Sequence, residues 1–139
     1  MVVRGVVQTF RRFKSRNAHD SCTFLAMCGI VGYCGHRQAE RVIIDGLRRL
    51  EYRGYDSAGL TVDGDREKEV LLFKQVGKVH ALRKHIAESS VDMDRTFVSH
   101  AGMAHTRWAT HGSPSPLNCH PHKSDPKGEF TVVHNGIIT

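Results

Sequence analysis

The apolar residues of this chain follow two different periods. Over residues 38–50 they recur three and four positions apart, which predicts an amphipathic helix ending near Glu51. Val79, Leu82 and Ile86 mark a second helix by the same spacing. Each predicted helix therefore has one apolar face that can pack on a core.

Shorter segments, alternating or continuously apolar, separate the two helices and predict strands. The predicted strands are residues 28–34, 57–62, 70–76, 96–105 and 129–134. Gly64 and its charged neighbours predict a turn that joins the second and third strands as a hairpin. This order of elements predicts an α+β fold built from hairpins rather than from regular βαβ units.

Composition agrees with one soluble globular domain. The chain has 139 residues, of which 40% are hydrophobic and 24% charged. Its apolar runs are far shorter than the roughly 20 residues that cross a bilayer, so we expect no membrane association.

The positive charge is concentrated in the first 27 residues. Five basic residues and one acidic residue lie there, so this extension carries +4 of the net charge of +6. The body is close to neutral, and aromatic residues make up only 7% of the chain, which argues against a nucleic-acid module. Residues 1–27 are interpreted either as unstructured sequence upstream of a start at Met27 or as an organelle-targeting peptide.

The four cysteines, at positions 22, 28, 34 and 119, form no CxxC pair. This usage favours a reducing, cytoplasmic setting over a secreted disulfide framework. Residues 118–122 read Asn-Cys-His-Pro-His and suggest a zinc site, but their spacing and the proline favour a loop. We therefore expect no metal and no other cofactor.

Cys28 directly follows Met27, which makes it the main candidate for chemistry. A start at Met27 followed by methionine removal leaves a thiol beside an α-amine with a pKa of roughly 7.7 to 8.0, which can accept the thiol's proton. In a chain that begins at Met1, the nitrogen of Cys28 is an amide and the thiol keeps a pKa of about 8.5. If its place directly after Met27 is ignored, Cys28 is predicted to be a small buried residue in a strand.

Four motifs occur in order through the body of the chain and together resemble a known family. They resemble the N-terminal glutaminase domain of the glutamine:fructose-6-phosphate aminotransferases, which are class II glutamine amidotransferases. Other amidotransferases with an N-terminal cysteine share the first and last motifs, whereas residues 51–53 and 107–112 favour the hexosamine-forming family. The motifs are residues 28–32, 49–59, 105–112 and 134–138.

The resemblance implies a fold and a domain organisation. It implies a partial four-layer αββα sandwich of the N-terminal nucleophile hydrolase type, in which residues 28–139 form an amidotransferase domain truncated at its C-terminus. The sugar isomerase domain would be absent, so fructose 6-phosphate would bind only through that missing part. The parent enzyme would be a cytoplasmic homo-oligomer.

The resemblance also assigns the catalytic residues. Cys28 would attack the side-chain amide of L-glutamine and release ammonia through a thioester. Asn135 and Gly136 would form the oxyanion hole. From the residues alone, an Asn-Gly pair after a strand predicts a hairpin turn.

The remaining assignments concern the glutamine pocket. Arg107 would clamp the α-carboxylate of glutamine, because a planar guanidinium offers two parallel donors. Trp108 would gate the passage of ammonia, Thr110 and His111 would line the pocket, and Arg53 would lie near the nucleophile. From the residues alone, Arg107 is predicted to form a salt bridge on the surface and Trp108 to be buried in the core. Arg53 is predicted to be a solvated residue in a turn.

The function implied is conversion of fructose 6-phosphate and glutamine to glucosamine 6-phosphate and glutamate, the first step towards UDP-N-acetylglucosamine. An inactive truncated product is the alternative, because an attached extension would block Cys28 and the aspartate expected downstream for the α-amino group is missing. Another class II amidotransferase, or a zinc or nucleic-acid binding module, is a further alternative.

Overall fold

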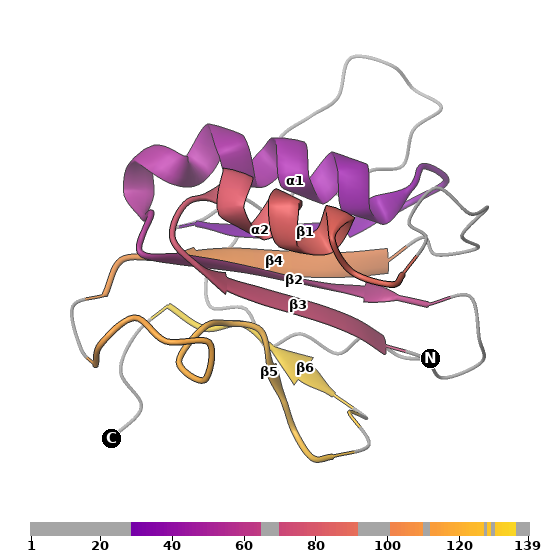
Figure 1. Cartoon of the computed structure of the whole chain (residues 1–139). Coiled ribbons are helices and arrows are strands. Elements are labelled where there is room, and N and C mark those ends of the chain that lie inside the picture. Colours follow the sequence, from indigo (N-terminus) through magenta and orange to yellow (C-terminus); the bar gives the residue numbers. More distant parts are fainter. Residues whose placement is uncertain are drawn as a thin grey trace.

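A computed structural model of the chain describes residues 29–64, 70–91, 101–109, 112–126, 128 and 130–135 (Figure 1). The basic extension, Cys28, and residues 96–100 of one predicted strand lie outside these ranges. Within them, two helices and a four-stranded sheet confirm the prediction of a mixed α+β fold. No helix in the described ranges is long and apolar enough to cross a membrane.

The four-stranded sheet is antiparallel throughout. Its strands run in the order β1-β4-β2-β3, so β4 is interior and contacts both β1 and β2. His105 of β4 lies opposite Ile30 on one side and opposite Gly59 on the other. The strands are β1 (Ile30–Cys34), β2 (Ser57–Asp63), β3 (Val70–Val76) and β4 (Ala101–Arg107), and β2 pairs with β3 as the predicted hairpin.

Both helices cover the same face of this sheet, the upper face in Figure 1. They are α1 (Ala39–Leu50) and α2 (Val79–Ala87), close to their predicted bounds, and a 3-10 turn, η1 (Glu51–Arg53), follows α1. The apolar faces of the two helices pack against every second residue of the strands, those on the helical side of the sheet. Burial of this apolar surface is the main stabilising contribution to the fold. The fully buried members of this core include Ile43, Leu47, Leu60 and Leu82.

A second, smaller layer lies on the opposite face of the sheet. It contains the antiparallel pair β5 (His122–Lys123) and β6 (Thr131–Val132), which lies below the sheet in Figure 1. Its apolar contact with the sheet is the cluster of Ile30, Met103 and Val133. The strand predicted over 129–134 is thus confirmed only at its centre, and β5 lies in a segment predicted to be a loop.

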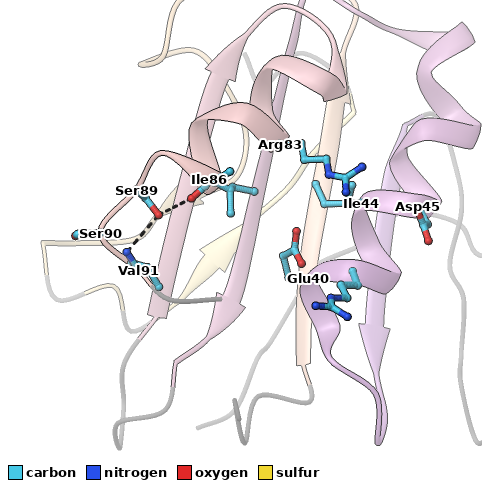
Figure 2. Close-up of a pocket in the computed structure, with 10 residues that line it drawn as sticks. Glu40, Ile44, Asp45, Arg83, Ile86, Ser89, Ser90 and Val91 are labelled. Atoms are coloured by element: carbon cyan, nitrogen blue, oxygen red, sulfur yellow. Dashed lines mark hydrogen bonds between the residues drawn. The ribbon is translucent and has the colours of Figure 1, made fainter. Parts of the chain in front are cut away.

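The helical layer carries a separate open groove between α1 and α2, with a volume of about 750 Å³. Figure 2 shows Glu40 and Ile44 of α1 facing Arg83 of α2 across it. None of the residues that line it belongs to the predicted glutamine site.

Candidate functional site

The carboxyl end of β4 organises the candidate site. Side chains alternate along a strand, so His105 and Arg107 point away from the helical layer, as does Met103, which packs on Val133. Thr106 points to the other side and is buried. His105 and Arg107 therefore belong to the face that also receives β5 and β6.

Gly29, directly before β1, is hydrogen-bonded to the carboxyl end of β4. The Thr106 backbone N–H donates to the Gly29 carbonyl at 2.7 Å. Gly29 has φ of +83°, and a Cβ there would lie 2.5 Å from Thr106 Oγ1, so both conformation and space require glycine. Gly29 is the residue bonded to Cys28, and Cys28 itself lies outside the described residues.

Asn135, the predicted oxyanion-hole residue, lies just after β6 and contacts the same strand. Its Oδ1 is 2.6 Å from His105 Nε2. Asn135 is exposed as a residue, whereas His105 is only 4% exposed. Asn135 thus contacts β4 only two positions before Arg107, although Asn135 lies 28 positions after Arg107 in the sequence. Gly136 lies outside the described residues.

The Arg107 guanidinium faces the loop that precedes β5. Nη1 donates to the Asn118 carbonyl and Nη2 to the Gly112 carbonyl, each at a long 3.4 Å. Contacts of this length are weak hydrogen bonds. The side chain is half-buried, with its planar group at the edge of the β5–β6 layer.

A second set of contacts fixes the backbone after Arg107. The Asp56 N–H donates to the Arg107 carbonyl at 3.1 Å, and the Ala109 N–H donates to Asp56 Oδ2 at 2.6 Å. A Cβ on Gly54 would lie 2.8 Å from the Arg107 carbonyl carbon. Gly54 and Asp56 were not predicted as site residues, although both lie inside the motif at 49–59, close in sequence to Arg53, which was predicted.

The aromatic residues near the site are exposed. Trp108 is 56% exposed and packs edge-on against Tyr55, with ring centroids 5.6 Å apart. The alternative that Trp108 is a core anchor is therefore wrong. Arg53 is also exposed, and its Nε donates to the Tyr52 hydroxyl at 2.8 Å. Thr110 and His111 lie outside the described residues.

Three histidine rings pack against one another beside Asn135, one pair tilted and the other edge-on. The centroids of His105 and His120 are 4.7 Å apart, and those of His120 and His122 are 4.4 Å apart. Burial lowers the pKa of His105 to about 4, although its hydrogen bond with Asn135 acts in the opposite direction, and the Arg107 charge lowers it further. Burial and the neighbouring His105 lower the pKa of His120 to about 4, and burial also lowers the pKa of His122. All three rings are neutral at neutral pH.

The residues proposed as a zinc alternative have other contacts here. The buried Cys119 thiol donates to the Ser115 carbonyl at 3.0 Å. Among the described residues, no group of three His, Cys, Asp or Glu side chains is arranged to hold a metal ion. The zinc alternative gains no support from this part of the chain.

The comparisons with known proteins relate the chain to glutamine amidotransferases. No protein-family model matches it. Its relatives are glutamine–fructose-6-phosphate aminotransferases: the Saccharomyces cerevisiae enzyme is 56% identical over 119 residues, and the Rattus norvegicus enzyme 1 is 48% identical over 127 residues. A relative from Schizosaccharomyces pombe is 50% identical over 119 residues.

Each of these matches covers 81% of this chain, and over that part the chain is homologous to the glutamine–fructose-6-phosphate aminotransferases. It spans only 17% to 19% of the length of these relatives. Homology therefore confirms the resemblance seen in the motifs, and it concerns a small part of a much longer enzyme.

Proposed function

We propose that this chain is the glutamine-hydrolysing part of a glutamine–fructose-6-phosphate aminotransferase, with Cys28 as its nucleophile. One structural observation carries the proposal: two contacts are made on consecutive residues at the end of β4, one by Asn135 and one by Gly29, the sequence neighbour of Cys28. Gly29, bonded to Cys28, is tied to Thr106, while Asn135 is tied to His105. Arg107 is the next residue of β4. These contacts support the proposal that the nucleophile, the oxyanion donor and the carboxylate clamp act together at this strand end.

The chemistry begins at the free amine of an N-terminal Cys28. The amine takes the thiol proton, and the thiolate attacks the side-chain amide carbon of glutamine. The proton then passes to the leaving nitrogen, which departs as ammonia, and a thioester remains. Water hydrolyses the thioester to glutamate and restores the thiol.

The oxyanion that forms during each attack needs hydrogen-bond donors in place beforehand. The Asn135 side-chain amide and the Gly136 backbone N–H supply them in this proposal. Such donors accelerate the reaction because they bind the transition state more strongly than the substrate.

Arg107 binds the α-carboxylate of glutamine. Its two terminal nitrogens already face oxygen atoms, the carbonyls of Gly112 and Asn118, and these weak contacts can be exchanged for a carboxylate. Trp108 gates ammonia, Thr110 and His111 line the glutamine pocket, and Arg53 supports the nucleophile. The exposure of Trp108 leaves it available to another part of the enzyme.

The architecture fits an αββα sandwich of N-terminal nucleophile hydrolases. The helical layer, the four-stranded sheet and the small β5–β6 layer support this part of the proposal, in which they would be its first three layers. Fructose 6-phosphate binds elsewhere in the parent enzyme, which makes glucosamine 6-phosphate in the cytoplasm as a homo-oligomer.

The first experiment determines the N-terminal residue of the protein isolated from its own cells, by N-terminal sequencing and intact mass. The same sample is treated with a glutamine analogue that carries an electrophilic diazoketone, with excess glutamine as competitor. We expect a chain that begins at Cys28 and is labelled there, with glutamine suppressing the label. A chain beginning at Met1 with an unlabelled Cys28 supports the alternative, an inactive product that descends from the enzyme.

A further inference from the structure

His105 is unusually placed for a histidine. It is 4% exposed, it lies on the interior strand of the sheet, and β1 and β2 flank it on both sides. Its position is therefore fixed by two hydrogen-bonded ladders. Its Nε2 reaches out of the sheet to Asn135 Oδ1 at 2.6 Å.

The chemistry of this contact defines the proton on the ring. An amide oxygen only accepts hydrogen bonds, so a contact at this distance needs a proton on His105 Nε2. Nδ1 of His105 is buried and has no hydrogen-bond partner among the described residues. A neutral ring with its proton on Nε2 satisfies its one donor, whereas a proton on Nδ1 would be an unpaired buried donor.

We propose that His105 is a positioning residue for glutamine hydrolysis: its Nε2–H holds Asn135 Oδ1, and the amide nitrogen of Asn135 is thereby turned towards the oxyanion. This inference rests on the proposed function. It goes beyond it by assigning a role to a residue that was not among the predicted site residues.

Asn135 needs such a partner because its amide can rotate. The oxygen and nitrogen ends are nearly the same size, so sterics alone hardly distinguish the two orientations. In the wrong orientation an oxygen faces the developing negative charge and repels it. The exposed side chain of Asn135 follows a strand of only two residues, so a rigid partner in the large sheet supplies the orientation.

The surroundings of His105 keep its ring neutral. Burial lowers its pKa to about 4, and Arg107 on β4, His122 on β5 and His134 after β6 lower it as well. The ring of His120, before β5, packs against it. A second ring proton would be a buried cation beside an arginine. The tautomer that holds Asn135 is therefore maintained through the neutral pH range.

The first test reads the tautomer directly and needs no activity. The full chain is labelled with ¹⁵N, and long-range ¹H–¹⁵N correlations of the His105 ring are recorded near neutral pH. We expect a protonated Nε2 and an unprotonated Nδ1. A proton on Nδ1, or a ring charged at neutral pH, overturns the proposal even if the protein hydrolyses glutamine.

The second test separates positioning from packing by comparing His105→Gln with His105→Leu. The glutamine amide can place an N–H near the position of Nε2, whereas leucine fills similar space without a donor. We expect His105→Leu to lower kcat roughly tenfold to a hundredfold with KM little changed, and His105→Gln to stay within about threefold of the wild type. Equal losses in both variants overturn the proposal.

A double-mutant cycle with Asn135→Ala shows whether His105 acts through Asn135. In that background, we expect His105→Leu to cause no further loss of kcat, because there is no amide left to orient. If the double variant instead loses kcat by the product of the two single-variant losses, the proposal is contradicted. If the wild-type protein does not hydrolyse glutamine, the proposed function fails, and the ring tautomer still decides whether His105 holds Asn135.

Discussion

Two strand glycines give a comparison at the residue scale. A Cβ on Gly59 of β2 would collide with the His120 carbonyl, because the loop before β5 lies directly on that strand. Gly32 of β1 has open space around the same position. We expect Gly59→Ala to lower the free energy of unfolding by about 2 kcal/mol through overpacking, as measured by urea denaturation.

Gly32→Ala is the control for this prediction, since it makes the same chemical change in the same sheet without a clash. We expect its free energy of unfolding to stay within about 0.5 kcal/mol of the wild type. Equal unfolding midpoints for the two variants would show that the loop does not press on β2.

Asn135 provides a second prediction at this scale, about activity rather than stability. Asn135→Ala removes one oxyanion donor, so kcat for glutamine hydrolysis should fall by roughly 10²- to 10³-fold. KM should change little, because the donor acts mainly in the transition state. Steady-state kinetics on the protein with a free Cys28 amine check this, and near-normal turnover would remove Asn135 from the oxyanion hole.

The roles of Arg107 and Asn135 were assigned through motifs and stay predictions. The structure places both residues near the end of β4, but the contacts that support them could not be read from the sequence. His105 was missed because a histidine inside a strand pattern carries no signal of its partner. Asp56 was missed because its contact with Ala109 joins residues 53 positions apart.

At the scale of elements, α2 depends on a residue outside itself. Lys78 at its N-cap makes no side-chain capping bond, and the Val79 N–H instead donates to Glu51 Oε1 at 2.7 Å. A helix of 9 residues is too short to be stable alone, so its first turn depends on such contacts. The carboxylate also lies at the positive end of the helix dipole.

We therefore expect Glu51→Ala to lower the free energy of unfolding by about 1 kcal/mol, the usual cost of losing an N-cap. Hydrogen exchange at the first turn of α2 should accelerate more than exchange in β4. Glu88→Ala is the control, because this exposed residue only forms a 3.7 Å ion pair with Lys84 on the surface. Similar losses in both variants would refute the capping role.

Elements with strong periodicity were predicted accurately, and short ones were not. The helix at 38–50 and the strand at 70–76 agree with α1 and β3 because each presents several residues of one pattern. β5 has only two residues, His122 and Lys123, and its pairing with β6 comes from tertiary contacts. Two residues are too few to show an alternating pattern, so the sequence alone predicts a loop there.

At the scale of the whole molecule, the strand order could not be derived from local pattern. β1 and β4 are neighbours although two helices and a hairpin separate them in sequence. This pairing places Gly29 beside Thr106. The motifs predict that their residues lie close together, but only the register gives the contact between the start of β1 and the end of β4.

The same long-range packing makes stability depend on pH. His105 is buried between the two layers, with a pKa of about 4 in the folded protein against 6.5 when solvated. Below pH 6.5 the unfolded chain therefore binds a proton that the folded chain does not, so stability falls as pH falls. His120, with a folded pKa also near 4, acts in the same direction.

For His105 alone, the loss between about pH 7.5 and about pH 5 is roughly 2 kcal/mol, and most carboxylates stay ionised over that range. Urea denaturation of the full chain at the two pH values measures it. His105→Gln cannot titrate, so its free energy of unfolding should depend less on pH by about that amount. An unchanged slope in this variant would mean that His105 is accessible to protons in the folded protein. The β5–β6 layer would then not exclude solvent from the face of the sheet where Asn135 and Arg107 lie.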